Sequence, residues 1–371
     1  MRVLIATATA GAGHLQAANA LEEAWTAWRS EDRVQKVDVL DYTPAVYKKA
    51  YSDGYAKVVA KAPELYASFF ESTDDPVLAR LSSGLRRGVG RTAARGFVDL
   101  VAGFRPDVVL APHFLPLEIL GGARQDGAPL LVSVVTDFEA HAFWMDPGVG
   151  LTCVAAPETK ARLVARGVPA RDVAVTGIPV SPRFAAAPGR AEARRRHGLR
   201  DDSPVLLVLA GGFGMGPVAE VVAGLGRAAG PLQLVVVCGR NEPLRRKVAS
   251  LDHPHPTRVL GFTREIPSLM AAADLVVTKP GGLTVSESLA LGRPLLVVNP
   301  IPGQEAANSD FLLERGAAVK AGRPEDLPAR VKALFSGGRL AQLARAARKL
   351  GRPGAADAVC RLAFKRAGGK G

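Results

Sequence analysis

Short runs of apolar, mostly β-branched residues alternate along the chain with stretches of helical periodicity. The runs are continuous rather than alternating with polar residues, which is typical of strands buried on both faces of a sheet. A regular succession of strand and helix predicts an α/β fold with doubly wound parallel sheets. The runs begin at Val3, Val37, Asp107, Leu130, Leu151, Val173, Val205, Leu232, Arg258, Asp274, Pro294 and Ala317.

The composition changes near residue 180. Residues 177–184, GIPVSPRF, contain two prolines and are followed by a strongly charged helical stretch. We therefore expect two Rossmann-like domains with parallel sheets facing a cleft, an N-terminal domain over 1–180 and a C-terminal domain over 181–350. Residues 351–371 predict a C-terminal helix with a frayed tail. Ligands of such sheets bind at the carboxyl ends of the strands.

Charge and cysteine content narrow the classes of function. The 371 residues include 48 Lys and Arg against 35 Asp and Glu, a net charge of +13, which favours an anionic partner. Three scattered cysteines and no C-x-x-C argue against a disulfide framework or a zinc cluster, and fit a reducing cytosol. An aromatic content of 6% and the lack of an RRM, helix-turn-helix or zinc pattern argue against a nucleic-acid partner. No apolar run is long enough to predict a spanning helix.

The first candidate site follows the first strand. The segment TATAGAGHLQ predicts a strand, a glycine turn and then a helix that begins near His14. Glycines allow a close approach of backbone and ligand, and the partial positive charge of a helix N-terminus favours a neutral imidazole. His14 is thus a candidate general base. The alternative is a histidine that caps the helix.

A second candidate lies in SVVTDFEAHAFWMDPGV, where a predicted strand ends at Asp137 and His141 and Trp144 follow. A polar strand end beside aromatic rings suggests a ligand that is partly apolar. The alternative is a loop with core aromatics. We expect Asp137 to be the second candidate base, or the residue that orients His14.

The strongest pattern is DLVVTKPGGLTVSESLALGRPLLVVNPIPGQEAANSDFLL. A strand ends in Lys-Pro before Gly281 and Gly282, and a helix follows at once, which is typical of a phosphate site. Glu287 lies just over one turn inside this helix, where a carboxylate can accept from ribose hydroxyls. The next strand is followed by amide and carboxylate side chains suited to sugar hydroxyls; these are Gln304, Glu305 and Asn308.

The other glycine loop of this half, GGFGMG, contains Gly212. It is a loose match to a dinucleotide loop, but the next strand ends in Cys-Gly-Arg-Asn and lacks the acidic residue that NAD requires. No D-x-D triplet occurs in the chain. We therefore expect no metal, and backbone amides with a helix dipole as the charge partner of a diphosphate.

These blocks, together with VVVCGRNEPLRRK and VLGFTREIPSLMAAADLVV, resemble the diacylglycerol glycosyltransferases. That group includes monogalactosyldiacylglycerol synthases and processive diacylglycerol glucosyltransferases, relatives of the GlcNAc transferase that makes lipid II. The resemblance covers nearly the whole chain in the family's order. One departure is Leu15-Gln16 after the histidine, where many members carry a basic and a small residue.

The resemblance implies a GT-B fold and an inverting, metal-independent transfer of glucose or galactose from a UDP-sugar to 1,2-diacylglycerol, giving a β-glycoside. It implies His14 as base, with Asp137 and His141 on the acceptor side. Alternatives are a UDP-GlcNAc transferase of the lipid-II type and a sugar-nucleotide epimerase of the same fold. The nucleotide-sugar site that it implies comprises Phe262, Gly281, Gly282, Glu287, Gln304 and Glu305. From the glycine loop and the segment after the next strand we add Gly212 and Asn308 as candidates.

A diacylglycerol acceptor implies peripheral attachment to an anionic membrane, expected on its cytoplasmic side. We expect the attachment within residues 47–95, where aromatic rings precede a cluster of arginines. The alternative is an amphipathic helix pair whose rings fill the core. The rings are Tyr51, Tyr55, Tyr66, Phe69 and Phe70, the arginines are Arg86, Arg87, Arg91 and Arg95, and Trp144 of the second candidate segment is a further candidate. The choice of sugar, the number of sugars added and the oligomeric state stay open.

Overall fold

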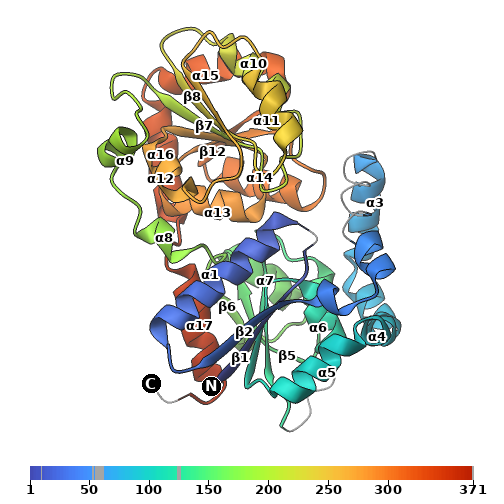
Figure 1. The fold of residues 1–371 in the computed structure, drawn as a ribbon. Coiled ribbons are helices and arrows are strands. Elements are labelled where there is room, and N and C mark those ends of the chain that lie inside the picture. Colours follow the sequence, from blue (N-terminus) through green and yellow to red (C-terminus); the bar gives the residue numbers. More distant parts are fainter. Residues whose placement is uncertain (10, 52–53, 55–61, 123–126, 370–371) are drawn as a thin grey trace. The chain divides into compact units, whose positions relative to one another are not determined.

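The computed structural model describes residues 1–9, 11–51, 54, 62–122 and 127–369. The chain divides into two compact units, close to the change of composition near residue 180. Unit 1 comprises Met1–Pro182, Pro302–Gln304 and Gly354–Gly371, and unit 2 comprises Arg183–Ile301 and Glu305–Pro353. Each unit is a parallel sheet covered by helices (Figure 1). The chain thus returns to unit 1 at its end.

Unit 1 contains a six-stranded sheet in the order β2-β1-β3-β4-β5-β6. Every neighbouring pair is parallel, and the strands are mostly apolar except the edge strand β2, whose sequence is RVQKVD. The order reverses between β1 and β3, which places the switch point of this doubly wound sheet there. The strands are β1 (Arg2–Thr7), β2 (Arg33–Asp38), β3 (Val108–Ala111), β4 (Leu130–Val134), β5 (Val149–Val154) and β6 (Val173–Val175).

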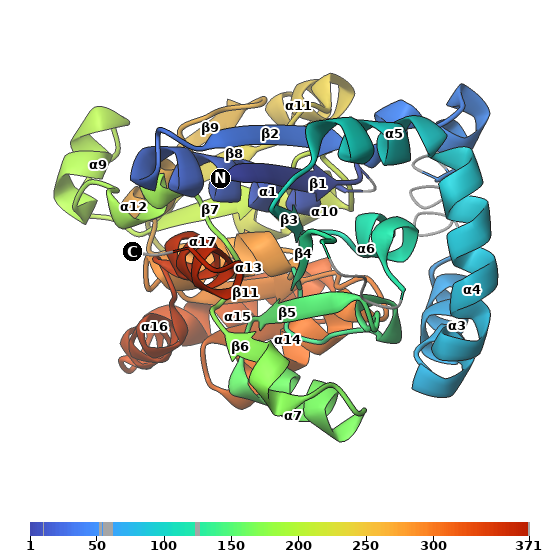
Figure 2. The same ribbon diagram turned by 90° about the horizontal axis from the view of Figure 1, so that it is seen from below.

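Helices cover both faces of this sheet. On one face α1 (Ala12–Trp28) packs beside α17 (Ala355–Arg366), where the rings of Trp28 and Phe364 meet edge to face. Figure 2 shows the long α4 on the other side of the unit, along the outside of α6. Residues 45–51 are also helical, and the other helices of unit 1 whose bounds are described are η1 (Val39–Tyr42), α3 (Pro63–Thr73), α4 (Pro76–Ala93), α5 (Arg95–Phe104), α6 (Phe114–Leu120), η2 (Ala142–Trp144), α7 (Pro157–Ala165) and η3 (Ala170–Asp172).

Unit 2 repeats the architecture with the order β12-β11-β10-β7-β8-β9, again parallel throughout. Its switch point lies between β7 and β10. The strands are β7 (Val205–Leu209), β8 (Gln233–Val237), β9 (Thr257–Leu260), β10 (Leu275–Thr278), β11 (Leu295–Val298) and β12 (Ala318–Ala321). All twelve apolar runs of the sequence contain or adjoin a strand, although β2 begins four residues before the run at Val37.

The helices that cover the second sheet follow its strands in turn. The linker helix is α8 (Pro182–Ala185), and the others are α9 (Arg190–Arg196), α10 (Val218–Gly226), α11 (Glu242–Ala249), α12 (Ile266–Ala272), α13 (Gly282–Ala290), α14 (Gln304–Glu314), η4 (Pro324–Asp326), α15 (Leu327–Phe335) and α16 (Arg339–Leu350).

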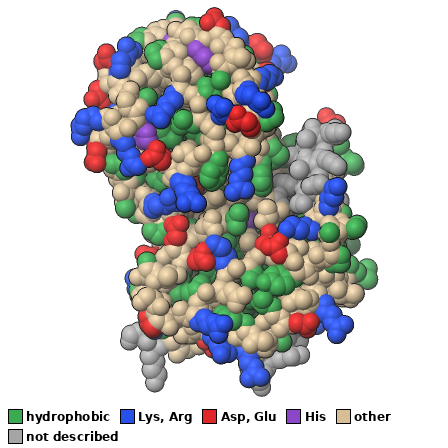
Figure 3. Space-filling view, viewed as in Figure 1, with side chains coloured by type: hydrophobic (Ala, Val, Ile, Leu, Met, Phe, Trp, Pro, Cys, Tyr) green, Lys and Arg blue, Asp and Glu red, His purple; other side chains and the backbone are tan. Residues whose placement is uncertain are grey.

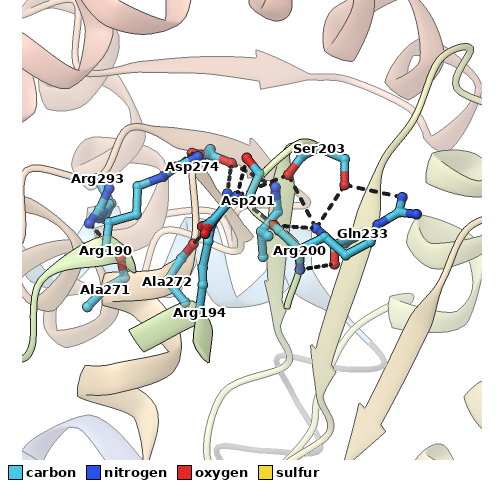
Figure 4. Close-up of polar contacts among 11 residues, drawn as sticks. Arg190, Arg194, Arg200, Asp201, Ser203, Gln233, Ala271, Ala272, Asp274 and Arg293 are labelled. Carbon is cyan, nitrogen blue, oxygen red and sulfur yellow. Dashed lines mark hydrogen bonds and ion pairs between the residues drawn. The ribbon is translucent and has the colours of Figure 1, made fainter. Parts of the chain in front are cut away.

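A buried arginine closes the amino-terminal edge of the second sheet (Figure 4). The guanidinium of Arg194 has no exposed surface and forms an ion pair with Asp274, which directly precedes β10. It also donates to the carbonyl oxygens of Arg200 at 2.8 Å, Ala272 at 3.1 Å and Ser203 at 3.2 Å. A charge so well satisfied holds α9 on the unit. Arg194 is therefore structural, although its neighbours in sequence form a basic run.

Candidate functional site

His14 lies at the switch point of the first sheet, three residues into α1. Its Nδ1 is 2.9 Å from the carbonyl oxygen of Pro112, which follows β3, and 3.1 Å from Oγ1 of Thr136, which follows β4. A carbonyl oxygen can only accept a hydrogen bond, so Nδ1 is the nitrogen that has the proton. Nε2 of the neutral ring then has a free lone pair. This is the tautomer that a general base requires.

A second imidazole lies against the first. His113 is 2% exposed, and its ring meets the His14 ring edge to face at a centroid distance of 4.5 Å. Its Nδ1 accepts from the backbone N–H of Leu115 at 3.0 Å and caps α6. Burial lowers the pKa of His14 to about 4 and the pKa of His113 well below its ordinary value. Removal from water, more than the α1 dipole that the sequence suggested, thus favours the neutral form of both rings.

The acceptor-side residues expected from the sequence lie near the ends of β4 and β5. Asp137 is half-buried directly after Thr136. His141 is buried and satisfied at both nitrogens, because Nδ1 accepts from Phe143 N–H at 3.1 Å and Nε2 donates to the Phe70 carbonyl at 3.0 Å. Trp144 is 5% exposed. The burial of His141 and Trp144 does not fit direct contact with a lipid, since both side chains hold the loop together.

Two loops flank the switch point of the second sheet. The loop after β7 contains Gly211, Gly214 and Gly216, whose positive φ values lie in the region that glycine favours, and Gly212 lies within it. Phe262 follows β9 and is 52% exposed, with the guanidinium of Arg240 over its ring at 5.1 Å. Because Phe262 is exposed, a nucleobase could approach its backbone and its ring.

The loop after β10 leads directly into α13. Gly281 is the N-cap of this helix and no side chain caps it, so the backbone N–H groups of its first turn have no side-chain acceptor. Glu287 is half-buried in α13, and burial raises its pKa to about 8, with Arg183 acting in the opposite direction. The free N–H groups favour an anion, and Glu287 provides a carboxyl group five residues after Gly282.

The residues after β11 divide into two kinds. Gln304 is half-buried at the start of α14, and Glu305 beside it is 6% exposed and forms an ion pair with Lys279. Asn308 has no exposed surface, and its Nδ2 donates to the carbonyl of Pro280 at 3.0 Å. The sugar contact expected of Asn308 does not fit this burial. Its amide instead supports the Lys279-Pro280 turn.

The arginines expected at a membrane differ in their surroundings. Arg87 forms an ion pair with Asp146 at 2.9 Å, and Arg86 lies over the ring of Phe143 at 4.3 Å. Arg91 and Arg95 are exposed, although Nε of Arg91 donates to a backbone carbonyl of α6. Arg86 and Arg87 therefore contact other residues of unit 1 and do not extend from its surface.

The rings of the same stretch also face inward where they are described. Tyr51 stacks on Tyr47 and lies 6.2 Å from His113 between ring centroids, and the ring of Phe70 packs on His141. Tyr55 lies outside the described residues, and nothing is described of the side chains of Tyr66 and Phe69. The described rings support the alternative of core packing.

Sequence reasoning missed three features. It gave no role to Thr136, Pro112 and His113, which only the strand order brings to His14, and none to Lys279. It also missed the outward-facing leucines of α4.

Within the described ranges, no group of three or more His, Cys, Asp and Glu side chains is placed to hold a metal ion. Across the same ranges, every helix is too short or too polar to cross a bilayer.

Two family models match the chain. Monogalactosyldiacylglycerol (MGDG) synthase matches residues 14–180, and glycosyl transferases group 1 matches residues 190–350. A processive diacylglycerol beta-glucosyltransferase of Bacillus pumilus (strain SAFR-032) is 30% identical over 339 residues, which cover 88% of this chain and 84% of the relative. The protein of the same name from Bacillus cereus (strain AH187) is 30% identical over 370 residues, covering 96% and 92%.

Solved structures resemble the chain over nearly its whole length. MurG of Acinetobacter baumannii has a TM-score of 0.59 at 20% identity, and the spinosyn rhamnosyltransferase SpnG has a TM-score of 0.60 at 17% identity, each covering 98% of this chain and 99% of the other. A UDP-GlcNAc 2-epimerase of Neisseria meningitidis also reaches a TM-score of 0.60, at 13% identity, with 98% and 100% covered. These matches confirm the GT-B fold expected from the sequence.

Proposed function

This chain belongs to the family of monogalactosyldiacylglycerol synthases and processive diacylglycerol beta-glucosyltransferases, and we propose that it transfers a hexose from UDP-glucose or UDP-galactose to the hydroxyl of 1,2-diacylglycerol. The main evidence for the proposal is the tautomer of His14. Its Nδ1 proton is bound by the Pro112 carbonyl, so Nε2 is free to take a proton from an acceptor hydroxyl.

The proposed reaction is a single displacement. As the acceptor oxygen attacks the anomeric carbon, its proton passes to Nε2 of His14. The bond between that carbon and the β-phosphate oxygen breaks, and its electron pair leaves with UDP. Attack opposite the leaving group converts an α-linked donor into a β-glycoside. Asp137, half-buried beside Thr136, is the second candidate base.

The proposed donor site is the carboxyl edge of the second sheet. The uncapped N-terminus of α13, which begins at Gly282 after the Gly281 N-cap, suits the diphosphate, and Glu287 suits the ribose hydroxyls. Gln304 and Glu305, in the first turn of α14, supply an amide and a carboxylate for the sugar. Phe262 and Gly212 flank the expected place of the uracil and the phosphates.

We propose that no divalent metal takes part, because the chain has no D-x-D triplet and Lys279 already places one positive charge beside the donor loops. Protein stripped of divalent ions should therefore keep its activity in excess EDTA. Loss of activity that Mg²⁺ or Mn²⁺ restores would contradict this part of the proposal.

We propose that unit 1 attaches to an anionic bilayer through the outer face of α4. In this helix the side chains of Arg86 and Arg87 contact residues of unit 1, whereas large apolar side chains face outward. Hydrophobic side chains lie along the right-hand edge in Figure 3, where Figure 1 places α3 and α4. The spacing of three and four residues forms one stripe, made of Leu78, Leu81, Leu85 and Val89, which are 55%, 75%, 76% and 55% exposed.

The choice of an anionic bilayer rests on charge. The exposed Arg91 and Arg95 follow the apolar stripe, and the chain as a whole has a net charge of +13. Apolar side chains beside basic ones are typical of a segment that lies in the membrane interface. A stripe of four neighbouring apolar side chains exposed to water is typical of a surface that contacts a membrane or a partner.

Vesicle cosedimentation tests this surface. The double variant Leu81→Ser/Leu85→Ser should lower the partition coefficient on anionic vesicles by at least about tenfold, because two apolar side chains lose their lipid contacts. Val164→Ser/Leu362→Ser removes two exposed apolar side chains elsewhere in unit 1 and is the matched control. Binding that survives the first change but not the second would place the attachment elsewhere.

The reaction itself is tested by incubating the purified protein with diacylglycerol vesicles and each UDP-sugar. We expect a hexosyl-diacylglycerol with a β linkage and stoichiometric UDP. Epimerised UDP-sugar without a lipid product would favour the epimerase alternative. Transfer only from UDP-GlcNAc to a lipid-linked sugar would favour the lipid-II type.

A further inference from the structure

Lys279 is a lysine held at the switch point of the second sheet. It directly follows β10, and its side chain reaches the loop after the neighbouring strand β7, where its Cε lies 3.8 Å from the position that a Cβ would take on Gly211. Its Nζ forms an ion pair with Glu305. The two side chains are 20% and 7% exposed, so the ammonium is largely withdrawn from water.

The surrounding framework holds this pair in place. Glu305 accepts the Ile301 N–H at 3.0 Å through its other carboxylate oxygen. Thr278 Oγ1 donates to the Leu209 carbonyl at 3.1 Å, which joins the ends of β10 and β7. A buried ion pair contributes little net stability, because desolvation offsets the attraction. Its position between the two glycine loops, beside the uncapped end of α13, therefore points to an anionic ligand.

We propose that Lys279 is a catalytic residue of the donor site, whose ammonium binds an oxygen of the donor's β-phosphate. This inference rests on the proposed function. When the bond between the anomeric carbon and the β-phosphate oxygen breaks, the electron pair stays on that oxygen, and the ammonium stabilises the added charge without giving up a proton. Lys279 thereby supplies the positive charge that other glycosyltransferases obtain from a metal ion.

Glu305 is the positioning residue in this arrangement. Before the donor binds, its Oε1 holds the ammonium and its Oε2 is held by the Ile301 N–H. When the ammonium turns to the phosphate, Oε1 is free to accept from a sugar hydroxyl. One carboxylate thus links arrival of the diphosphate to recognition of the sugar.

Calorimetric titration with UDP and with UMP tests the contact directly. In Lys279→Met the affinity for UDP should fall about 10- to 100-fold, while that for UMP, which lacks the β-phosphate, should change less than about threefold. Lys332→Met, at an exposed position of α15, is the matched control and should leave both affinities unchanged. Equal losses for UDP and UMP, or no loss for either, would overturn the assignment.

Kinetics give a second readout. We expect kcat of Lys279→Met to fall about 10²- to 10³-fold, and Lys279→Arg to recover part of it because the charge is restored. Glu305→Gln should raise KM for the UDP-sugar more than it lowers kcat. Thermal unfolding of each variant separates loss of function from loss of fold. If Lys279→Arg recovers nothing although it folds, the charge is not what matters and the proposal fails.

The titrations need no acceptor, so they separate this inference from the proposed function. A wild type that binds UDP but glycosylates no lipid would contradict the function and leave Lys279 testable. A wild type that glycosylates diacylglycerol, with a UDP affinity that Lys279→Met leaves intact, would contradict only the inference.

Discussion

In each unit the candidate catalytic or binding residues follow two strands that adjoin the switch point of the sheet. These strands are β1 and β3 in unit 1, and β7 and β10 in unit 2. The two edges share this topology but differ in electrostatics. At the first edge, the half-buried His14 packs on the buried His113, and removal from water lowers the pKa of both imidazoles. At the second, Lys279 and Glu305 form an ion pair beside an uncapped helix.

The difference shows how one architecture can provide two kinds of site. Removal from water lowers the affinity of an imidazole for a proton and so keeps its lone pair available for a neutral hydroxyl. Fixed charges and free N–H groups instead stabilise an anion. The first edge therefore suits an acceptor alcohol, and the second a nucleoside diphosphate.

The largest expected effect comes from removing the first imidazole. His14→Asn should lower kcat about 10²- to 10⁴-fold, because no group then takes the acceptor proton. UDP affinity should stay unchanged, since the proposed donor site lies at the carboxyl edge of the second sheet. Steady-state kinetics and UDP calorimetry on the same preparation measure both. His253→Asn, a half-buried histidine of unit 2, is the control, and a kcat of His14→Asn within a few-fold of wild type would transfer the role to Asp137.

Changes at the carboxyl edge of the second sheet should lower the affinity for UDP rather than kcat. Glu287→Gln should weaken UDP binding by about 1–3 kcal/mol, because ribose hydroxyls lose a charged acceptor. In wild type the affinity should also rise with pH, since the carboxyl of the free protein has a pKa of about 8 and binding to ribose favours its ionised form. Calorimetry at pH 7 in buffers of different ionisation enthalpy should detect proton release in wild type.

The Glu287→Gln variant tests whether the released proton comes from Glu287. Glu287→Gln should lose the proton release that wild type shows, while any release from the phosphates stays in both proteins. An unchanged affinity and an unchanged proton count would remove Glu287 from the nucleotide site.

A smaller effect is expected from the second partner of Nδ1. Thr136→Val keeps the shape of this buried side chain and removes the hydroxyl 3.1 Å from Nδ1 of His14. We expect kcat to fall about threefold to tenfold, the effect of one net hydrogen bond. Thr152→Val, equally buried in β5 of the same sheet, should leave kcat unchanged. Equal effects of the two changes would mean that Thr136 acts on packing alone.

Much of the fold could be predicted from local patterns. Continuous apolar runs and glycine turns marked both sheets, and the prolines near residue 180 marked the division into units. Local pattern carries no information on long-range packing, so the return of α17 to unit 1 was not foreseen. The same limit applies to Trp144 and His141, whose aromatic character suggested a ligand but which pack inside the unit.

The candidate sites were predictable only where a motif is local. Gly281, Gly282 and Glu287 lie within one turn-and-helix segment, so their spacing alone suggested a phosphate site. The partners of His14 lie in the loops after two other strands, about a hundred residues away, and no spacing reveals them. The α4 stripe misled for another reason: a helix that turns its arginines inward has the same sequence pattern as one that turns them to water.

The pH dependence of kcat/KM for the acceptor, measured at saturating UDP-sugar, tests the central claim that a neutral imidazole removed from water takes the acceptor proton. His14 loses its function when it is protonated, so the rate must fall as the pH falls through its pKa. With that pKa at about 4, the rate should show no decline from pH 7 to pH 5 and an acid limb near pH 4. An acid limb at the ordinary histidine value of about 6.5 would contradict the account.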